Sequence, residues 1–213
     1  MEYCGIDLHA EYSQTCILDE DGEVMETSRV RTSRKALERF FRRKPMRVVI
    51  EAGGSSPWFS RLLQSIGHEV VVCSPGRVRL IAESKLKNDR VDAEVLARLV
   101  RLDPEFLQPI QHRSERAQLL RANLKVRSAM VEARTKWINT VRGLLRSFGY
   151  KVSGKAPHTF VDRVDKMDLP DDLKMVIDPL LEQLDLLTGE IECRNEHLEE
   201  MVKDLPEVEH LRQ

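Results

Sequence analysis

Apolar residues in the first hundred positions fall into short runs that predict strands and into helical spacings that predict helices. The runs at 3–8, 48–50 and 69–73 predict three strands, and the lack of polar alternation at 48–50 is typical of a strand covered on both faces. The runs at 13–18 and 24–30 flank a turn of three acidic residues and a glycine. This pattern predicts a β-hairpin at the start of the chain.

Three helices are predicted between and after these strands. Ser33 can cap a helix that continues through Arg43, and the glycine-rich turn at 53–57 leads into a second helix that ends at Gly67. A third, amphipathic helix begins near Asn88. The resulting order is β-β-β-α-β-α-β-α, which predicts an α/β fold with a mixed sheet.

From residue 114 onwards the apolar residues keep a helical spacing. Ser114 can cap a helix that reaches about Phe148, Pro170 suits the start of a second long helix, and residues 149–169 are expected to be irregular. Each long helix would span roughly 50 Å at the α-helical rise. Two such helices with a short connection favour an antiparallel pair, and their long apolar stripes predict a dimer or larger homo-oligomer. We therefore expect two domains, 1–110 and 111–213.

Composition excludes several classes of protein. Charged residues make up 32% and aromatic residues 5% of the 213 residues, which suits long solvated helices beside a modest core. The sequence has neither an apolar run of about 18 residues nor a signal-peptide pattern, so a cytoplasmic protein with no membrane partner is expected. The four cysteines lack CxxC spacing, which predicts reduced thiols rather than disulfides or zinc ligands.

The net charge of −1 hides a strong segregation of charge. Residues 1–113 carry 18 basic and 17 acidic side chains, residues 114–155 carry 10 and 2, and residues 156–213 carry 6 and 16. The basic first long helix can therefore meet phosphates. The alternative is that the acidic second helix neutralises it within an antiparallel pair.

Four acidic residues are the candidates for chemistry. Asp7 and Glu51 end two of the predicted strands, and Asp89 and Asp92 stand at i and i+3 on one helix face, so the four can converge on one point. Oxygen ligands of this kind suit Mg²⁺ or Mn²⁺, and such metals clamp the oxygens of a phosphoryl displacement. The plainer alternative is that they are caps or surface charges, with Asn88 or Asp89 as a helix N-cap.

The motifs around these acidic residues resemble a known family. The strand Gly5-Ile6-Asp7-Leu8-His9, the string Glu51-Ala52-Gly53-Gly54 before a tryptophan-bearing helix, and the string Lys87-Asn88-Asp89-Arg90-Val91-Asp92-Ala93 are similar to the DEDD-type insertion-sequence transposases. That family comprises the bridge-RNA-guided recombinases and includes the Piv DNA invertase. The resemblance covers essentially the whole chain.

The resemblance implies a fold, a site and partners. It implies a RuvC-like, RNase H-type domain followed by a helical coiled-coil region, in a bacterial or archaeal cell. It also implies that Asp7, Glu51, Asp89 and Asp92 are catalytic metal ligands for Mg²⁺ or Mn²⁺, and that DNA and a structured guide RNA are partners. In this family a serine of a further C-terminal domain attacks the phosphate. No serine of these 213 residues matches that nucleophile, so we expect the domain to follow Gln213 in the complete protein.

Basic residues beside the acidic site are the candidates for nucleic-acid binding, because cations next to a metal cluster guide a polyanion toward it. Part of the basic helix is expected to join them. The candidate residues are Arg77, Arg79, Lys85, Lys87, Arg90, Arg127, Arg134 and Arg142.

Other functions fit parts of the same pattern. A RuvC-like junction nuclease would hydrolyse DNA with two metals and water as the nucleophile, without needing serine. A sugar-kinase or actin-like ATPase also opens on Gly-Ile-Asp-Leu, but such a protein needs a glycine-rich phosphate loop where His9-Ala10-Glu11 stands. A non-catalytic module for RNA binding and dimerisation is the third alternative.

Overall fold

The chain folds into two compact units, Met1–Arg113 and Ser114–Gln213. The computed structural model describes residues 1–74 and 89–203, without the side chains of Asp89 and Arg90. Four of the residues predicted to bind nucleic acid, Arg77, Arg79, Lys85 and Lys87, lie outside the described residues.

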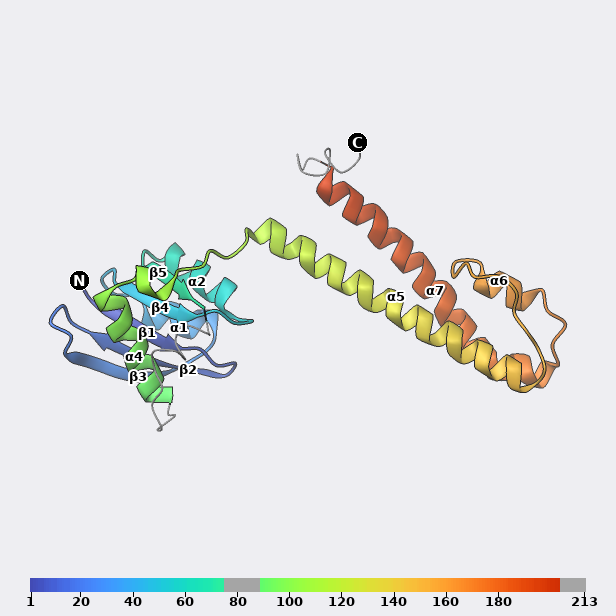
Figure 1. The fold of residues 1–213 in the computed structure, drawn as a ribbon, viewed down its shortest axis with the longest axis horizontal. Coiled ribbons are helices and arrows are strands. Elements are labelled where there is room, and N and C mark those ends of the chain that lie inside the picture. Colours follow the sequence, from blue (N-terminus) through green and yellow to red (C-terminus); the bar gives the residue numbers. More distant parts are fainter. Residues whose placement is uncertain (75–88, 204–213) are drawn as a thin grey trace. The chain divides into compact units, whose positions relative to one another are not determined.

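The first unit is built on a five-stranded mixed sheet (Figure 1). Its strands are β1 (Tyr3–Asp7), β2 (Tyr12–Leu18), β3 (Val24–Arg31), β4 (Arg47–Glu51) and β5 (Glu69–Cys73), in the order β3-β2-β1-β4-β5. The hairpin strands pair antiparallel with one another and with β1, whereas β1, β4 and β5 run parallel. The predicted mixed α/β sheet is therefore confirmed, with β5 at its expected bounds.

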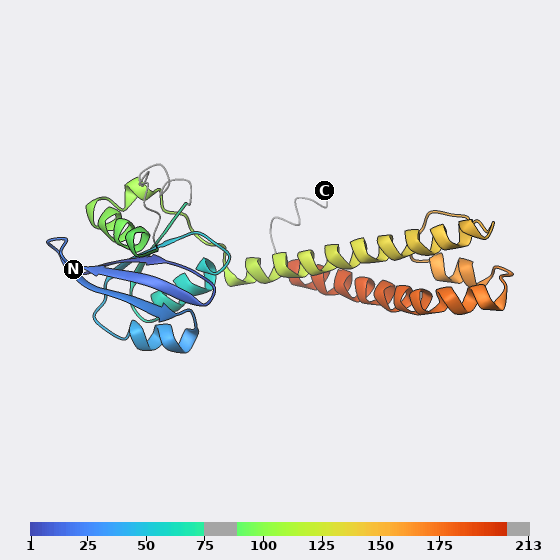
Figure 2. The same ribbon diagram turned by 90° about the horizontal axis from the view of Figure 1, so that it is seen from below.

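Helices cover both faces of this sheet (Figure 2). Helices α1 (Arg34–Phe40) and α2 (Ser56–Ser65) pack on one face, where Ile6, Ile50 and Phe59 belong to the main core. Helix α4 (Asp89–Leu102) packs on the other face, and the short 3₁₀ helix η1 (Glu105–Leu107) follows it. Both faces of β1 and β4 are thus buried, which explains why their sequences lack polar alternation.

Local signals set several of these boundaries. The Ser33 hydroxyl accepts a hydrogen bond from the Ala36 N–H at 3.4 Å and caps α1. The Asp19 carboxylate accepts from the N–H groups of Asp21 and Glu23 at 3.0 and 2.9 Å, which closes the hairpin turn. These polar contacts form within a few residues, so the sequence alone could predict them.

Gly5 allows α4 to lie directly on β1. A methyl group at Gly5 would overlap the Ala93 carbonyl oxygen and the Ala97 nitrogen, and would lie 2.9 Å from Leu96 Cβ. Two of these atoms belong to the helix backbone, so the helix axis itself would have to move. Glycine is therefore the residue that permits this helix–strand distance.

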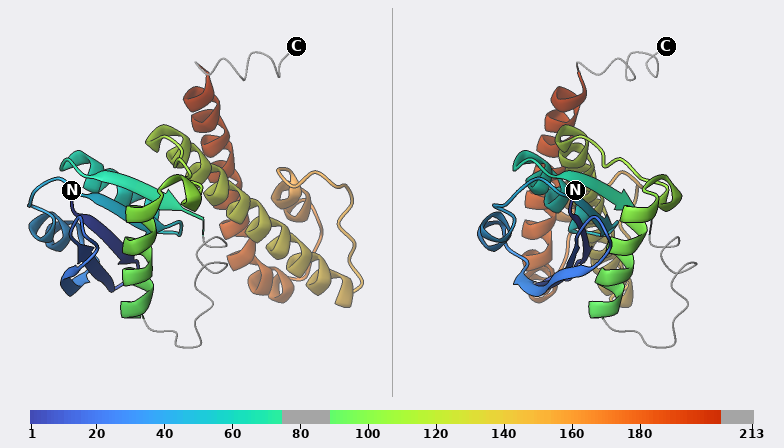
Figure 3. Two further views of the ribbon diagram at one scale, coloured as in Figure 1. Left: turned by 60° about the vertical axis from the view of Figure 1, so that its left-hand side comes forward. Right: turned by 90° about the vertical axis from the view of Figure 1, so that its left-hand side faces the viewer.

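The second unit is a pair of long helices, α5 (Glu115–Ser147) and α7 (Asp171–Val202), which lie side by side (Figures 1 and 3). Hydrogen bonds from Arg116 to the Met201 carbonyl and from Arg127 to Asn195 show that they run antiparallel. The Ser114 hydroxyl caps α5 by accepting from the Ala117 N–H at 3.2 Å. No helix in the described part of the chain is both long and apolar enough to cross a membrane.

Two details of the second unit differ from the sequence-based expectation. The segment expected to be irregular contains a short helix, α6 (Phe160–Asp165), because Phe160 and Val164 are buried in the core between the long helices. Pro170 is the N-cap of α7 rather than its first helical residue, with an extended ψ of 142°. The first difference arises from packing contacts made by residues distant in sequence.

Candidate functional site

Two of the predicted ligands, Asp7 and Glu51, stand at the carboxyl ends of neighbouring parallel strands. The register pairs Gly5 with Val49 and Ile6 with Ile50, so it brings Asp7 beside Glu51. Gly5 and Val49 both face α4, and side chains alternate along a strand, so Asp7 and Glu51 also face that side. Adjacent strands lie about 4.8 Å apart, which places the two carboxylates within reach of one ion.

His9 contacts the first of these carboxylates. Its Nε2 lies 2.9 Å from Asp7 Oδ2, and the Asp7 side chain is only 18% exposed whereas that of His9 is 53% exposed. A carboxylate accepts hydrogen bonds, so Nε2 is the protonated nitrogen of this ring. The contact holds one Asp7 oxygen in a fixed orientation at the edge of the site.

Cys73 lies on the other side of Glu51. The register pairs Glu51 with Cys73, whose Sγ donates to the Ile50 carbonyl oxygen at 3.4 Å. Burial, together with the negative charge of Glu51, raises the pKa of the Cys73 thiol to about 12. The Cys73 thiol is therefore protonated at neutral pH.

Helix α4 begins at the end of the sheet where Asp7 lies. Its C-terminal half contacts the opposite end, because Arg98 and Arg101 donate to the carbonyl oxygens of Gly22 and Glu20, each at 3.2 Å. That hairpin turn follows Leu18, which pairs with the first residue of β1. The first turn of α4, with Asp89 and Asp92, therefore lies toward the carboxyl end of β1.

The structure thus brings two predicted ligands side by side and directs the start of α4 toward them. Asp92 is half-buried. Among the described side chains, which exclude that of Asp89, no group of three His, Cys, Asp or Glu residues is close enough to hold a metal ion. The four-ligand set stays a prediction.

The glycine turn before α2 is a tight turn in this structure. The Gly53 N–H donates to the Ser56 hydroxyl at 2.9 Å, and that hydroxyl donates back to the Gly53 carbonyl at 2.8 Å. The Gly53 N–H therefore has a partner within the turn. Ser56 thus closes the turn that leads into α2.

The predicted nucleic-acid residues on α5 contact other parts of the second unit. Arg127 bonds to Asn195, and Arg142 donates to the Gly154 carbonyl at 3.1 Å while stacking on Phe160. Arg134 is half-buried as well. Within the ranges 1–74 and 89–203 no ion pair joins α5 to α7, so the acidic helix does not neutralise the basic one through direct contacts there. Nucleic-acid binding by these three residues stays a prediction.

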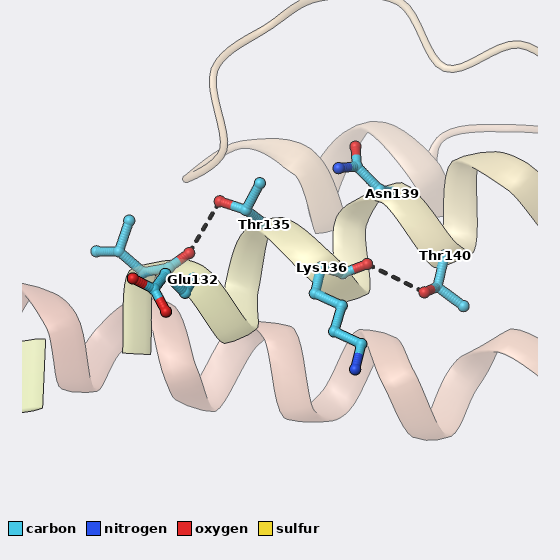
Figure 4. A pocket seen from close by; sticks show the side chains of 6 residues that line it. Glu132, Thr135, Lys136, Asn139 and Thr140 are labelled. Atoms are coloured by element: carbon cyan, nitrogen blue, oxygen red, sulfur yellow. Dashed lines mark hydrogen bonds between the residues drawn. The ribbon is translucent and has the colours of Figure 1, made fainter. Parts of the chain in front are cut away.

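A solvent-facing depression of about 670 Å³ lies on α5, lined by Val131, Glu132, Thr135, Lys136, Asn139 and Thr140 (Figure 4). Thr135 and Thr140 donate their hydroxyls to carbonyls of their own helix at 2.8 and 3.0 Å. These hydroxyls are therefore satisfied within the helix, and the two threonines need no polar partner on another molecule.

The first unit contains a short basic segment, although its total charge is close to zero. Residues 29–47 contain nine Lys or Arg residues and a single acidic residue, Glu38, although residues 1–113 as a whole are nearly neutral. These nine residues, half of the unit's basic residues, lie on β3, on α1, in the loop after α1 and at the start of β4.

Comparison with known proteins adds a relationship across most of the chain. A family model for the DEDD transposases of the IS110 type, described as a transposase, matches residues 4–149. The transposase for insertion sequence element IS1111A of Coxiella burnetii is 34% identical over 147 residues, which cover 68% of this chain and 39% of that protein. The transposase for IS1328 of Yersinia enterocolitica is 33% identical over 123 residues, 57% of this chain and 36% of that protein.

The chain thus spans about two fifths of the length of these relatives. Among solved structures, RuvC of T. thermophilus in complex with a Holliday junction substrate aligns with 46% of this chain and 90% of that one. Its TM-score is 0.32 and its sequence identity is 13%.

Proposed function

The chain belongs to the DEDD-type insertion-sequence transposases, and we propose that Asp7, Glu51, Asp89 and Asp92 together bind Mg²⁺ or Mn²⁺ and act on DNA phosphodiesters. The observation that carries this proposal is the parallel pairing of β1 with β4 up to Ile6 and Ile50, which ends with Asp7 and Glu51 at the same edge of the sheet as the first turn of α4. The matched region 4–149 includes all four residues.

The chemistry of the donor set fits such an ion. Hard divalent cations prefer carboxylate oxygens, and the four residues provide these from three different elements. When bound, the metal would neutralise charge that develops on the phosphate oxygens. The chain's own groups would hold that arrangement: His9 fixes one oxygen of Asp7, and the α4 backbone packed against Gly5 fixes the helix that carries Asp89 and Asp92.

The attacking group is proposed to come from elsewhere in the complete protein. We infer that a serine of a further domain joins the carboxylates in a composite active site and becomes covalently linked to DNA. A structured guide RNA would then choose the DNA sites. The resemblance to bridge-RNA-guided recombinases supports these two proposals.

Calorimetric titration with Mn²⁺ tests the metal site. Wild type should release or take up heat with saturation, whereas Asp89→Ala and Asp7→Asn should bind about 100-fold more weakly, because each removes a ligand from a shared ion. Glu38→Ala, which removes an exposed carboxylate on α1, is the matched control and should bind as wild type does. Equal binding by Asp89→Ala and wild type would rule out a shared site.

Self-association through α5 is a second proposal. Leu119, Ala122, Val126, Ala129 and Ala133 recur at spacings of three and four and so share one face of α5. Leu119 and Val126 are 55% and 47% exposed, so this face is not covered by α7. The same spacing continues to Lys136 and Thr140 in the depression shown in Figure 4. A second copy of the chain would cover this face.

Light scattering at micromolar concentration should therefore give twice the monomer mass of 24.6 kDa. Leu119→Glu with Val126→Glu should restore the monomer mass, because each places a charge in the apolar contact. Leu186→Glu, at a 64% exposed position on α7, should leave the dimer intact. A monomer mass for wild type at every concentration would contradict this proposal.

A further inference from the structure

The basic segment 29–47 begins in the last residues of β3, the edge strand of the sheet. Strand β3 stands at one edge of the sheet and, among the described strands, pairs only with β2. Its side chains Arg29 and Arg31 are exposed. Neither arginine belongs to any ion pair within the part of the chain that the structure describes. The edge of the sheet therefore presents two cations that no acidic side chain compensates there.

The register places Arg29 in line with the predicted metal ligands. Asp7 pairs with Gln14 on β2, and Gln14 pairs with Arg29 on β3. Cross-strand partners share a face of the sheet, so the row Glu51, Asp7, Gln14 and Arg29 lies on the side that α4 covers in part. Two strand spacings separate Asp7 from Arg29, which amounts to about 10 Å between their Cα atoms.

An aromatic ring holds Arg29 in place. The guanidinium carbon lies 4.6 Å from the centroid of the Tyr12 ring, and Tyr12 is 41% exposed. Tyr12 pairs with Arg31 across the hairpin, so the three side chains occupy adjacent positions on one face. A stacked guanidinium keeps its N–H edge available for an oxyanion and loses less side-chain entropy when it binds one.

The basic surface continues around the edge strand onto α1. A groove of about 780 Å³ is lined by Arg29, Arg31, Lys35, Arg39 and Arg43, with Glu26 as its acidic residue. Glu26 accepts a hydrogen bond from Arg43 at 2.8 Å, and this contact, followed by the bond from Ser28, lowers the pKa of Glu26. The charges of Glu26 and Arg43 therefore neutralise each other. The other four cations of the groove, Arg29, Arg31, Lys35 and Arg39, stay available to a ligand.

We propose that this edge, defined as Tyr12, Arg29, Arg31, Lys35 and Arg39, is a DNA-binding surface that leads a strand into the carboxylate site. Arg29 and Arg31 bind its phosphates, Tyr12 positions Arg29, and Lys35 and Arg39 bind the flanking backbone. Successive base pairs of duplex DNA rise 3.4 Å along the helix axis, so a separation of about 10 Å along that axis places the Arg29 contact about three base pairs from the phosphate at Asp7.

The charge and the position of the surface together select DNA as the occupant. Four cations with no opposing carboxylate suit a polyanion. The row ends at Asp7 and Glu51, and this inference rests on the proposal that these residues act on a DNA phosphodiester. The same surface would otherwise serve RNA, which the experiment distinguishes.

Fluorescence anisotropy with labelled DNA tests this surface, using the whole chain in EDTA over a series of KCl concentrations. Arg29→Gln with Arg31→Gln should weaken DNA binding about tenfold at low salt and reduce the salt slope by about two, because two phosphate contacts are lost. Tyr12→Ser should weaken binding about threefold, on the order of a lost cation–π contact, whereas Tyr12→Phe, which keeps the ring under Arg29, should bind as wild type does. Lys151→Gln with Lys155→Gln removes the same charge from exposed positions of the second unit and should leave the slope unchanged.

Three results would overturn the proposal: an unchanged slope in the double arginine variant, an equal loss in the lysine control, or a loss confined to RNA of the same length. EDTA removes any bound metal, so this assay measures DNA binding separately from metal binding at the carboxylate site. If the metal-site proposal is wrong, the anisotropy result for DNA still stands. If the DNA-surface proposal is wrong, the calorimetric result for Mn²⁺ still stands.

Discussion

Replacing Gly5 with alanine is expected to cost about 4 kcal/mol or more of the free energy of unfolding of the first unit, near the upper end for single substitutions. The new methyl group would overlap the Ala93 carbonyl and the Ala97 nitrogen. Overpacking against flexible side chains costs about 1–3 kcal/mol, but here backbone atoms oppose the methyl group, so the whole of α4 must shift. Small domains have only about 5–15 kcal/mol in total, so most of this stability would be lost.

Urea denaturation followed by circular dichroism measures this effect. Gly53→Ala is the matched control, because a methyl group at Gly53 meets no atom within 4 Å. That control should change stability by about 0.5 kcal/mol or less, as surface substitutions do. If Gly5→Ala proves as stable as Gly53→Ala, the close packing of α4 on β1 is wrong, and so is the placement of Asp92.

This chain alone is expected to perform no strand exchange. In the proposed site the carboxylates would hold a metal at a phosphate, but no serine of the 213 residues matches the family nucleophile, so no covalent link between protein and DNA should form. Water can replace serine in principle, and weak Mn²⁺-dependent nicking is compatible with the account. With a downstream domain present, Asp92→Ala should lower adduct formation by about three orders of magnitude, the size of effect that loss of one group stabilising transition-state charge produces.

A denaturing gel reports this outcome, because a covalent protein–DNA adduct survives denaturation and a non-covalent complex does not. Incubation of the chain with guide RNA and paired DNA sites should give no shifted band. Glu38→Ala serves as the control for loss of a carboxylate outside the site and should behave as wild type in every arm.

Elements whose signals are local could be predicted from the sequence. Ser33 and Ser114 cap their helices through bonds to an N–H three residues later, and both caps are found where the sequence places them. The strand β5 is found at Glu69–Cys73, as its apolar run predicts. The capping residues and apolar run that specify these elements lie within or next to them.

Features that depend on distant contacts could not be predicted in the same way. Helix α6 is stabilised by burial of Phe160 and Val164 against α5 and α7, although its own sequence has only six helical residues. Gly5 looks like any strand glycine until α4, about ninety residues later, is seen to cross it. In both cases the determining neighbour is far away in the chain.

The candidate site also combines features that follow from local sequence signals with features that depend on distant contacts. The placement of Asp7 and Glu51 at one edge of the sheet follows from the rule that parallel strands end at the same edge, so the sequence could suggest it. The direction of α4 depends on Arg98 and Arg101 at the hairpin turn, and no local signal near Asp92 reveals it. The net charge of the first unit does not reveal the basic segment 29–47, because the acidic remainder of the unit offsets its nine cations.

Supplying the proposed serine domain in trans, with guide RNA, paired DNA sites and Mg²⁺, tests the composite site most directly. Covalent adducts should appear with wild-type residues 1–213 and should disappear when the Asp92→Ala variant takes the place of the wild-type chain. Adducts formed by residues 1–213 without the added domain would contradict the account, because the nucleophile would then lie within this chain. Adducts formed equally well with Asp92→Ala would also contradict it, because the carboxylates would then be unnecessary.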